Sequence, residues 1–463
     1  MEVSKLLQQL SIPTHVGASD DAAKRFLDLP DPSENLDRAY MFLVWQGTVR
    51  IVLEQLRRAG ADLDEFVISP DRYRRTFFSY KPVWNLDIEP PITASKLLDV
   101  ILRQRDLLTA SVLHLADAGV EDFALLSGRA LQARYPAYND RGEFDTDLIT
   151  PQLAAAGPIA DALADVGFEL DTVRVRRLGS HPDSIVEIRS NQHGHRLSVG
   201  VVVGGYFGYR GPILERSTKE ALAGRRLSTP SPEDLLVMLS ARVERKRKFA
   251  LVNVNDAAAV VRHSGADFDW DYVFNAARRF DLADTLAIVL ERAVDQPGVE
   301  LPQQWRSGLV DHDIRTLRLG RLIATDDLTF GLSRSRSARR RRRLWLLALR
   351  RKQFKREDQT LAARGIGRVQ ERLLRNQLRH LHAGGAPRRW DPAASRMRTR
   401  VGTFCEIAPS MAATEGCLAP GGISHQRGPA AGLLDDVATT FRSSRSTHNC
   451  DQFRFSFTTR KGI

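Results

Sequence analysis

Two aspartates inside a short apolar run constrain the fold of this chain more than any other feature. Asp145 and Asp147 stand one residue apart in the segment FDTDLIT, residues 144–150. The alternation of polar and apolar residues predicts a β-strand, in which residues i and i+2 lie on the same face. Two neighbouring carboxylates repel each other and are costly to remove from water, so the sequence favours a cation beside them.

A Ser-Gly pair earlier in the chain favours the same kind of site. Ser127 and Gly128 end one apolar run and precede a short helical pattern. Such a turn allows backbone N–H groups to approach a phosphate closely, and Mg²⁺ accepts both carboxylate and phosphate oxygens. Arg129 and Arg141 could add charge-assisted hydrogen bonds to a triphosphate. The alternative is an ordinary strand-to-helix turn with solvated acids and surface arginines.

The element order around these residues predicts an α+β fold. Helical patterns dominate residues 1–115, including one expected helix at 34–58 and another at 95–118 with Ser95 as its N-cap. Residues 116–227 alternate strand, helix, strand and helix before several further strands. A hairpin is expected where NQHG separates SIVEIRS from RLSVGVVVGG.

Helical patterns return in residues 228–333. Ser231 followed by Pro232 is typical of a helix start, and two further helices are expected at 253–263 and 269–294. Asp256 is interpreted as a helix-start cap. The alanine-rich helical segment PQLAAAGPIADALADVG is expected to be interrupted at Gly157-Pro158. The predicted fold is therefore a mixed sheet flanked by N-terminal and C-terminal helical regions.

Residues 334–463 differ in character from the rest. They contain 28 Lys+Arg and 9 Asp+Glu, a net charge of +19, which leaves 40 basic and 47 acidic residues, a net of −7, in residues 1–333. A basic tail of low order that stays outside the core is expected. Its clustered arginines favour salt-dependent binding of nucleic acid. The alternative is that this Arg-, Ala-, Gly- and Pro-rich sequence comes from a frame-shifted read of a GC-rich gene, in which case the tail has no function.

The remaining composition excludes several classes of protein. The three cysteines, Cys405, Cys417 and Cys450, all lie in the tail, and their spacing matches no metal-binding pattern. No apolar stretch is long enough to cross a membrane, and the first residues lack the pattern of a secretory signal. A cytoplasmic protein with no membrane partner is therefore expected.

The segments LLSGRALQARYP, FDTDLIT and ALADVGF resemble the nucleotidyltransferases of the DNA polymerase-β superfamily. They look closest to a poorly characterised bacterial group, and toxin-type nucleotidyltransferases of abortive-infection systems look like more distant relatives. The resemblance covers about residues 30–300. It implies transfer of a nucleoside monophosphate from an NTP to a hydroxyl of RNA, protein or a small molecule. It also implies that Ser127 and Gly128 form the glycine turn, that Asp145 and Asp147 hold Mg²⁺, and that Lys246 and Lys248 contact the triphosphate.

Two departures from the superfamily pattern keep other functions open. The turn reads Ser-Gly rather than Gly-Ser, and the strand expected to carry a third carboxylate has Gly200 in its place. Glu187, on the neighbouring predicted strand, is the nearest acid that could act as the third catalytic residue. The alternatives are a catalytically weak or inactive binding protein with this fold, and a nucleic-acid-binding protein that acts through its tail.

Overall fold

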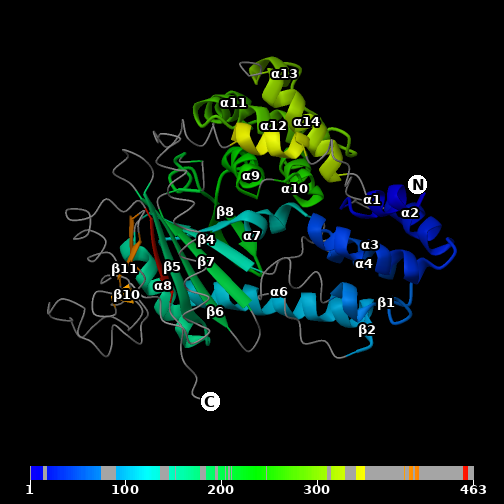
Figure 1. Ribbon diagram of the computed structural model, residues 1–463, viewed down its shortest axis with the longest axis horizontal. Helices are drawn as coiled ribbons and strands as arrows, with labels where there is room; N and C mark the ends of the chain where they lie inside the picture. The colour runs from blue at the N-terminus through cyan, green and yellow to red at the C-terminus, as the bar shows by residue number, and fades with distance from the viewer. Residues whose placement is uncertain are drawn as a thin grey trace.

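The computed structural model describes most of the first 349 residues and four short tail segments. The described ranges are 2–13, 18–73, 90–135, 145–151, 153–177, 184–192, 197–203, 205–206, 209, 211–246, 248–309, 314–328, 340–349, 390–391, 396–399, 402–405 and 452–456. They form a mixed α+β fold in which helical regions flank a mixed sheet, as the sequence predicts. Figure 1 shows helices α9 to α14 above the sheet and helices α3 and α4 to one side.

The central sheet has the strand order β13-β5-β6-β7-β4-β3 among the described residues. Strand β4 is parallel to β7, and the other neighbours in the sheet are antiparallel. The expected strand at FDTDLIT and the expected hairpin of β6 and β7 are both confirmed. The strands are β3 (Ala124–Leu126), β4 (Asp145–Thr150), β5 (Glu169–Arg177), β6 (Ser184–Gln192), β7 (Leu197–Val203) and β13 (Gln452–Ser456).

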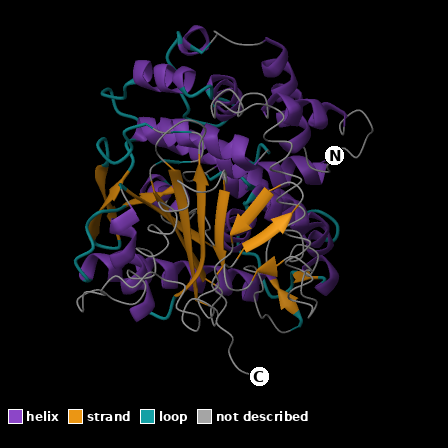
Figure 2. Cartoon of the chain, turned by 60° about the vertical axis from the view of Figure 1, so that its left-hand side comes forward, coloured by secondary structure: helices purple, strands orange, loops and turns teal. Residues whose placement is uncertain are grey.

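Small sheets make up the other described strands. β1 (Val67–Ile68) pairs with β2 (Ile92–Thr93), and β8 (Thr218–Leu222) pairs with β9 (Arg225–Thr229). In the tail, β10 (Trp390–Asp391), β11 (Arg396–Thr399) and β12 (Gly402–Cys405) form a three-stranded sheet. Figure 2 shows the strands of the larger sheet side by side, with a layer of helices above them.

One face of the central sheet is buried by apolar contacts. Thr146 and Leu148 on β4 are buried, as are Val199 and Val201 in the corresponding positions of β7. Helices α6 (Ala94–Asp117) and α8 (Leu153–Asp165) pack against the sheet. Helix α8 continues through Pro158, so the expected interruption is wrong. Buried side chains before and after the proline, including Ala156 and Ile159, hold both halves against the core.

The N-terminal helices are α1 (Glu2–Leu10), α2 (Ala18–Leu27), α3 (Pro32–Gln46) and α4 (Val49–Arg58), followed by α6. The single helix expected at 34–58 is wrong, because Gly47 adopts a left-handed conformation, with φ of 71°, and ends α3. A Cβ at this position would lie 3.1 Å from Val252 Cγ1, a tight contact that the valine would have to relieve by a small shift. Thr93, not Ser95, caps α6 by accepting a hydrogen bond from the Lys96 backbone N–H.

The C-terminal helices pack on one another above the sheet. The expected cap at Ser231 is confirmed, since its hydroxyl accepts a 3.2 Å hydrogen bond from the Asp234 N–H. The expected helix at 269–294 is two helices, because Asp281 has a φ of 54° and breaks it. The bounds are α9 (Pro232–Lys246), α10 (Leu251–Arg262), α11 (Trp270–Arg279), α12 (Ala283–Ala293), α13 (Trp305–Gly308) and α14 (Ile314–Leu328).

A helix at 340–349, within the basic tail, packs against this body. Trp345 is 1% exposed, and its ring centroid lies 5.4 Å from that of Phe249. Arg341 forms a 2.8 Å ion pair with Asp326 at the end of α14. The packed body therefore extends past Ser333, because Trp345 and Leu349 are one helical turn apart and both are buried.

Among the described residues, no helix combines the length and the apolar content that crossing a membrane requires.

Candidate functional site

The strand register brings the Ser-Gly turn and the two aspartates to one end of the sheet. β3 runs antiparallel to β4 and pairs Leu126, its last residue, with Asp147. Ser127 and Gly128 therefore follow directly beside Asp147. β7 runs parallel to β4 and pairs Ser198 with Asp145 and Gly200 with Asp147.

Asp145 and Asp147 share the less buried face of β4. Asp145 is exposed and Asp147 is half-buried, whereas Thr146 between them is fully buried on the opposite face. This alternation is the one that a strand imposes on successive residues. Two carboxylates on adjacent positions of one open face can hold one Mg²⁺ if phosphate oxygens and water complete its coordination.

The position beside Asp147 on β7 carries no acid. Gly200 is the paired residue, at about one strand spacing of 4.8 Å. Glu187 pairs instead with Val202 on β7 and with Arg174 on β5. It lies two strands and two residues from Asp147, so their Cα atoms are about 12 Å apart. In the described part of the chain, no three His, Cys, Asp or Glu residues are grouped so that they could hold a metal.

Ser127 and Gly128 are the first residues of a short helical segment that is held from two sides. It consists of α7 (Ser127–Leu131) and a 3-10 helix, η2 (Gln132–Arg134). Arg129, which is buried, donates 2.8 Å hydrogen bonds to Thr109 of α6 and to the side chain of Gln132. Arg134 forms a 2.6 Å ion pair with Glu220 of β8. The structure thus places Arg129 in contact with α6, while Arg141 lies outside the described residues.

Tyr135, directly after η2, is tied to the C-terminal helices. Its hydroxyl donates a 2.6 Å hydrogen bond to Asp256 Oδ1, and Arg242 Nη1 lies 3.2 Å from Asp256 Oδ2. Asp256 lies in the interior of α10 and is fully buried, so its interpretation as a helix-start cap is wrong. The one signal in the sequence was an acid amid the apolar residues of that helix, VNDAAAVV.

The two lysines proposed as phosphate contacts differ in their surroundings. Lys246 is exposed in the last turn of α9. The Lys248 ammonium donates a 2.6 Å hydrogen bond to the carbonyl of Trp45 at the end of α3, and lies 4.7 Å from the centroid of the Trp45 ring. Burial, together with the nearby Arg242 and Arg342, lowers the pKa of Lys248 to about 7. Lys248 thus contacts the N-terminal helices through Trp45 of α3.

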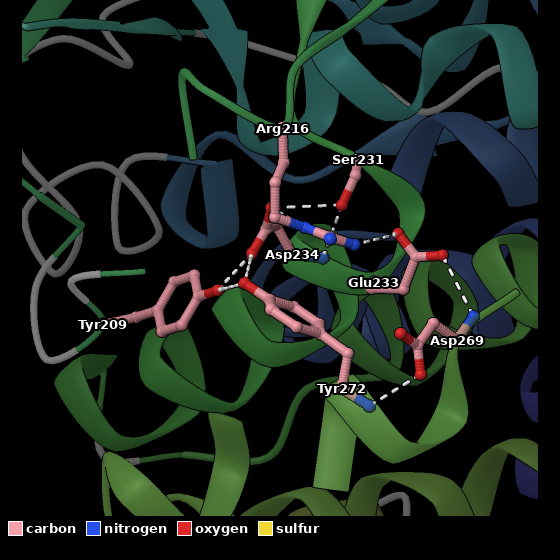
Figure 3. Close-up of polar contacts among 7 residues, drawn as sticks. All are labelled: Tyr209, Arg216, Ser231, Glu233, Asp234, Asp269 and Tyr272. Carbon is pink, nitrogen blue, oxygen red and sulfur yellow. Dashed lines mark hydrogen bonds and ion pairs between the residues drawn. The ribbon is translucent and has the colours of Figure 1, made fainter. Parts of the chain in front are cut away.

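A buried acid at the start of α9 organises the loop that follows β7 (Figure 3). Asp234 is fully buried and accepts hydrogen bonds from the hydroxyls of Tyr209 and Tyr272, the latter at 2.7 Å. Arg216 lies 3.4 Å from Asp234 and packs 3.9 Å from the centroid of the Tyr272 ring. Burial raises the pKa of Tyr272 to about 12, so its hydroxyl remains a donor at neutral pH. The sequence did not indicate this cluster, because its members lie far apart in the chain.

Comparison with known proteins finds no matching family model and no matching curated protein. Two solved structures are similar in part. An antigenic nucleotidyltransferase-like protein from Paracoccidioides brasiliensis is 18% identical over 44% of this chain and 92% of its own, with a TM-score of 0.28. JHP933 from Helicobacter pylori is 14% identical over 54% of this chain and 97% of its own, with a TM-score of 0.24. Both TM-scores lie below 0.5, so these likenesses assign no function to this chain.

Proposed function

We propose that this chain is a nucleotidyltransferase-fold protein that binds an NTP with Mg²⁺ and transfers the nucleoside monophosphate to an acceptor hydroxyl. The observation that supports it is the register of β3, β4 and β7. That register places Asp145 and Asp147 on one open face, directly beside the turn of Ser127 and Gly128.

Each group at the site has a role in this proposal. The carboxylates of Asp145 and Asp147 would hold the cation, and the backbone of the Ser127-Gly128 turn would lie against the phosphates. Bound Mg²⁺ would offset the charge of the phosphate oxygens and of the leaving pyrophosphate. The acceptor oxygen bonds to the α-phosphorus, the bond from that phosphorus to the β-phosphate oxygen breaks, and the acceptor proton passes to water.

A second candidate is a protein that binds the nucleotide without transferring it efficiently. The pairing of Gly200 with Asp147 favours it, because the paired position offers no carboxylate to accept the acceptor proton. General-base assistance is typically worth about 10²–10⁴-fold in rate. Both candidates share nucleotide binding, so the first experiment tests binding and the second tests transfer.

The binding experiment measures the affinity for a fluorescent ATP analogue with Mg²⁺ and with EDTA. The Asp145→Asn/Asp147→Asn variant should bind at least about tenfold more weakly, because charge-assisted contacts to the cation are lost. Asp117→Asn is the matched control, since Asp117 is an exposed acid that pairs with Arg225 away from the strand. The proposal would be refuted if the affinity were the same with EDTA as with Mg²⁺, and the same in the double variant as in the wild type.

The transfer experiment follows ATP labelled at either the α- or the γ-phosphate in the presence of cell extract. Nucleotidyl transfer leaves α-label on the acceptor and releases γ-label as pyrophosphate. Fractionation of the α-labelled product into RNA, protein and small molecules then identifies the acceptor class. Binding without any retained α-label would favour the second candidate. Retention of γ-label on the acceptor would instead indicate a kinase reaction and refute nucleotidyl transfer.

A further inference from the structure

The short helical segment that begins at Ser127 and ends before Tyr135 is joined to the C-terminal helices, through Tyr135, by one hydrogen-bonded network. Tyr135 donates to Asp256 Oδ1 at 2.6 Å. Arg242 of α9 donates to Asp256 Oδ2 at 3.2 Å, so each carboxylate oxygen has a donor from a different part of the fold. Asp256 is 0% exposed and Tyr135 is 6% exposed.

Such an arrangement is costly to disturb. A buried carboxylate needs partners, and removing a partner leaves part of its charge uncompensated in a poorly solvated environment. The network therefore fixes Tyr135 strongly relative to α9 and α10. Since Arg134, the preceding residue, is paired with Glu220 of β8, the end of η2 is held on both sides.

We propose that Asp256 is a positioning residue for the nucleotide site. With Arg242 it holds Tyr135, and through Tyr135 it fixes the helical segment 127–134, which begins with Ser127 and Gly128 and lies beside Asp147 through the pairing of Leu126. The inference rests on the proposed function, because it concerns the geometry of the same site. Ligand-binding groups must be held within a fraction of an ångström, and misplacement by about 1 Å can cost as much as 10²-fold.

The molecule contains a matched control for this network. Tyr272 donates a 2.7 Å hydrogen bond to Asp234, which like Asp256 is fully buried and which lies in the first turn of α9. That pair connects α11 to the start of α9 and does not include the segment between Ser127 and Asp145. The Tyr272 hydroxyl also lies 2.8 Å from the Tyr209 hydroxyl, so Tyr272→Phe, like Tyr135→Phe, removes a tyrosine hydrogen bond to a buried aspartate.

The experiment measures Mg²⁺–ATP affinity and thermal midpoint for Tyr135→Phe, Tyr272→Phe and Asp256→Asn in the full chain. Tyr135→Phe and Asp256→Asn should each weaken binding on the order of tenfold, whereas Tyr272→Phe should change it by less than about twofold. The midpoints should fall comparably for the two tyrosine variants. The double variant Tyr135→Phe/Asp256→Asn should bind no more weakly than Asp256→Asn, because both changes break one network.

The outcomes separate this inference from the proposed function. If the wild type binds Mg²⁺–ATP, but Tyr135→Phe and Tyr272→Phe alter affinity equally, Asp256 has only a structural role and the inference is wrong. The inference is also wrong if Tyr135→Phe leaves affinity unchanged. If the wild type binds no Mg²⁺–ATP, or if Asp145→Asn/Asp147→Asn has no effect, the proposed function fails and the inference fails with it.

Discussion

Lys248 is expected to make the stability of this protein rise between pH 7 and pH 9. Its ammonium is buried beside the Trp45 carbonyl and ring, with two arginines, Arg242 and Arg342, close enough to repel it. Burial is the largest cause of its lowered pKa, and the two arginines add to the effect. Its pKa falls from the ordinary 10.5 to about 7.

The sign of the effect follows from proton binding in the two states. In the unfolded chain Lys248 holds its proton up to its ordinary pKa, whereas in the folded chain it releases the proton near pH 7. Between these values unfolding takes up a proton, so raising the pH favours the folded state. The two pKa values imply a gain of about 2 kcal/mol from pH 7 to pH 9.

The assay compares thermal midpoints of the wild type and Lys248→Met at pH 7 and pH 9. A difference of about 2 kcal/mol corresponds to about 3 °C in a body of this size, so the wild type should gain about 3 °C relative to Lys248→Met. Lys246→Met is the matched control, because Lys246 is an exposed lysine two residues earlier, in the last turn of α9, and it should follow the wild type.

Parallel pH profiles for the wild type and Lys248→Met would refute this reasoning. They would show that Lys248 keeps its proton in the folded state, through solvent access or a carboxylate neighbour. The comparison between variants also removes the contributions of other titrating groups, because these are common to both proteins. The absolute midpoint of Lys248→Met is less informative, since the variant also loses the hydrogen bond to Trp45.

Three other substitutions and a pair of shortened chains test the tail helix and the end of the sheet. Trp345→Ala should lower the free energy of unfolding by about 3–5 kcal/mol in thermal or denaturant unfolding, because the ring is buried. A chain ending at Leu349 should also unfold at a higher temperature than one ending at Ser333. Equal midpoints for the two shortened chains would contradict this. Gly200→Asp should raise α-label transfer at least about tenfold with Mg²⁺, since it supplies an acid beside the aspartate pair. Glu187→Gln should leave transfer unchanged, given its register, and loss of transfer would contradict that placement.

Local patterns in the sequence predicted the elements that local forces decide. The strand at FDTDLIT follows from alternation, and the cap at Ser231 follows from one side chain and the N–H three residues later. The sequence does not predict the helix breaks at Gly47 and Asp281, because apolar periodicity continues across both positions. Each depends on a single left-handed residue, and at Gly47 the packing against Val252 also contributes. Periodicity alone cannot detect such breaks.

Three buried aspartates explain why the candidate site could be predicted only in part. Asp234 receives Tyr209 from the loop after β7, Asp256 receives Tyr135 from the segment before β4, and Asp327 pairs with Arg342 of the tail helix. In the sequence each of these aspartates lies within a helical pattern, and its partner belongs to a different segment of the chain. In the structure all three lie on C-terminal helices and hold segments from outside them. Of the three, Asp256 holds the segment that begins at Ser127. Substitutions at Asp256 should therefore alter nucleotide binding without contacting the nucleotide, whereas substitutions in the Asp234 cluster should not.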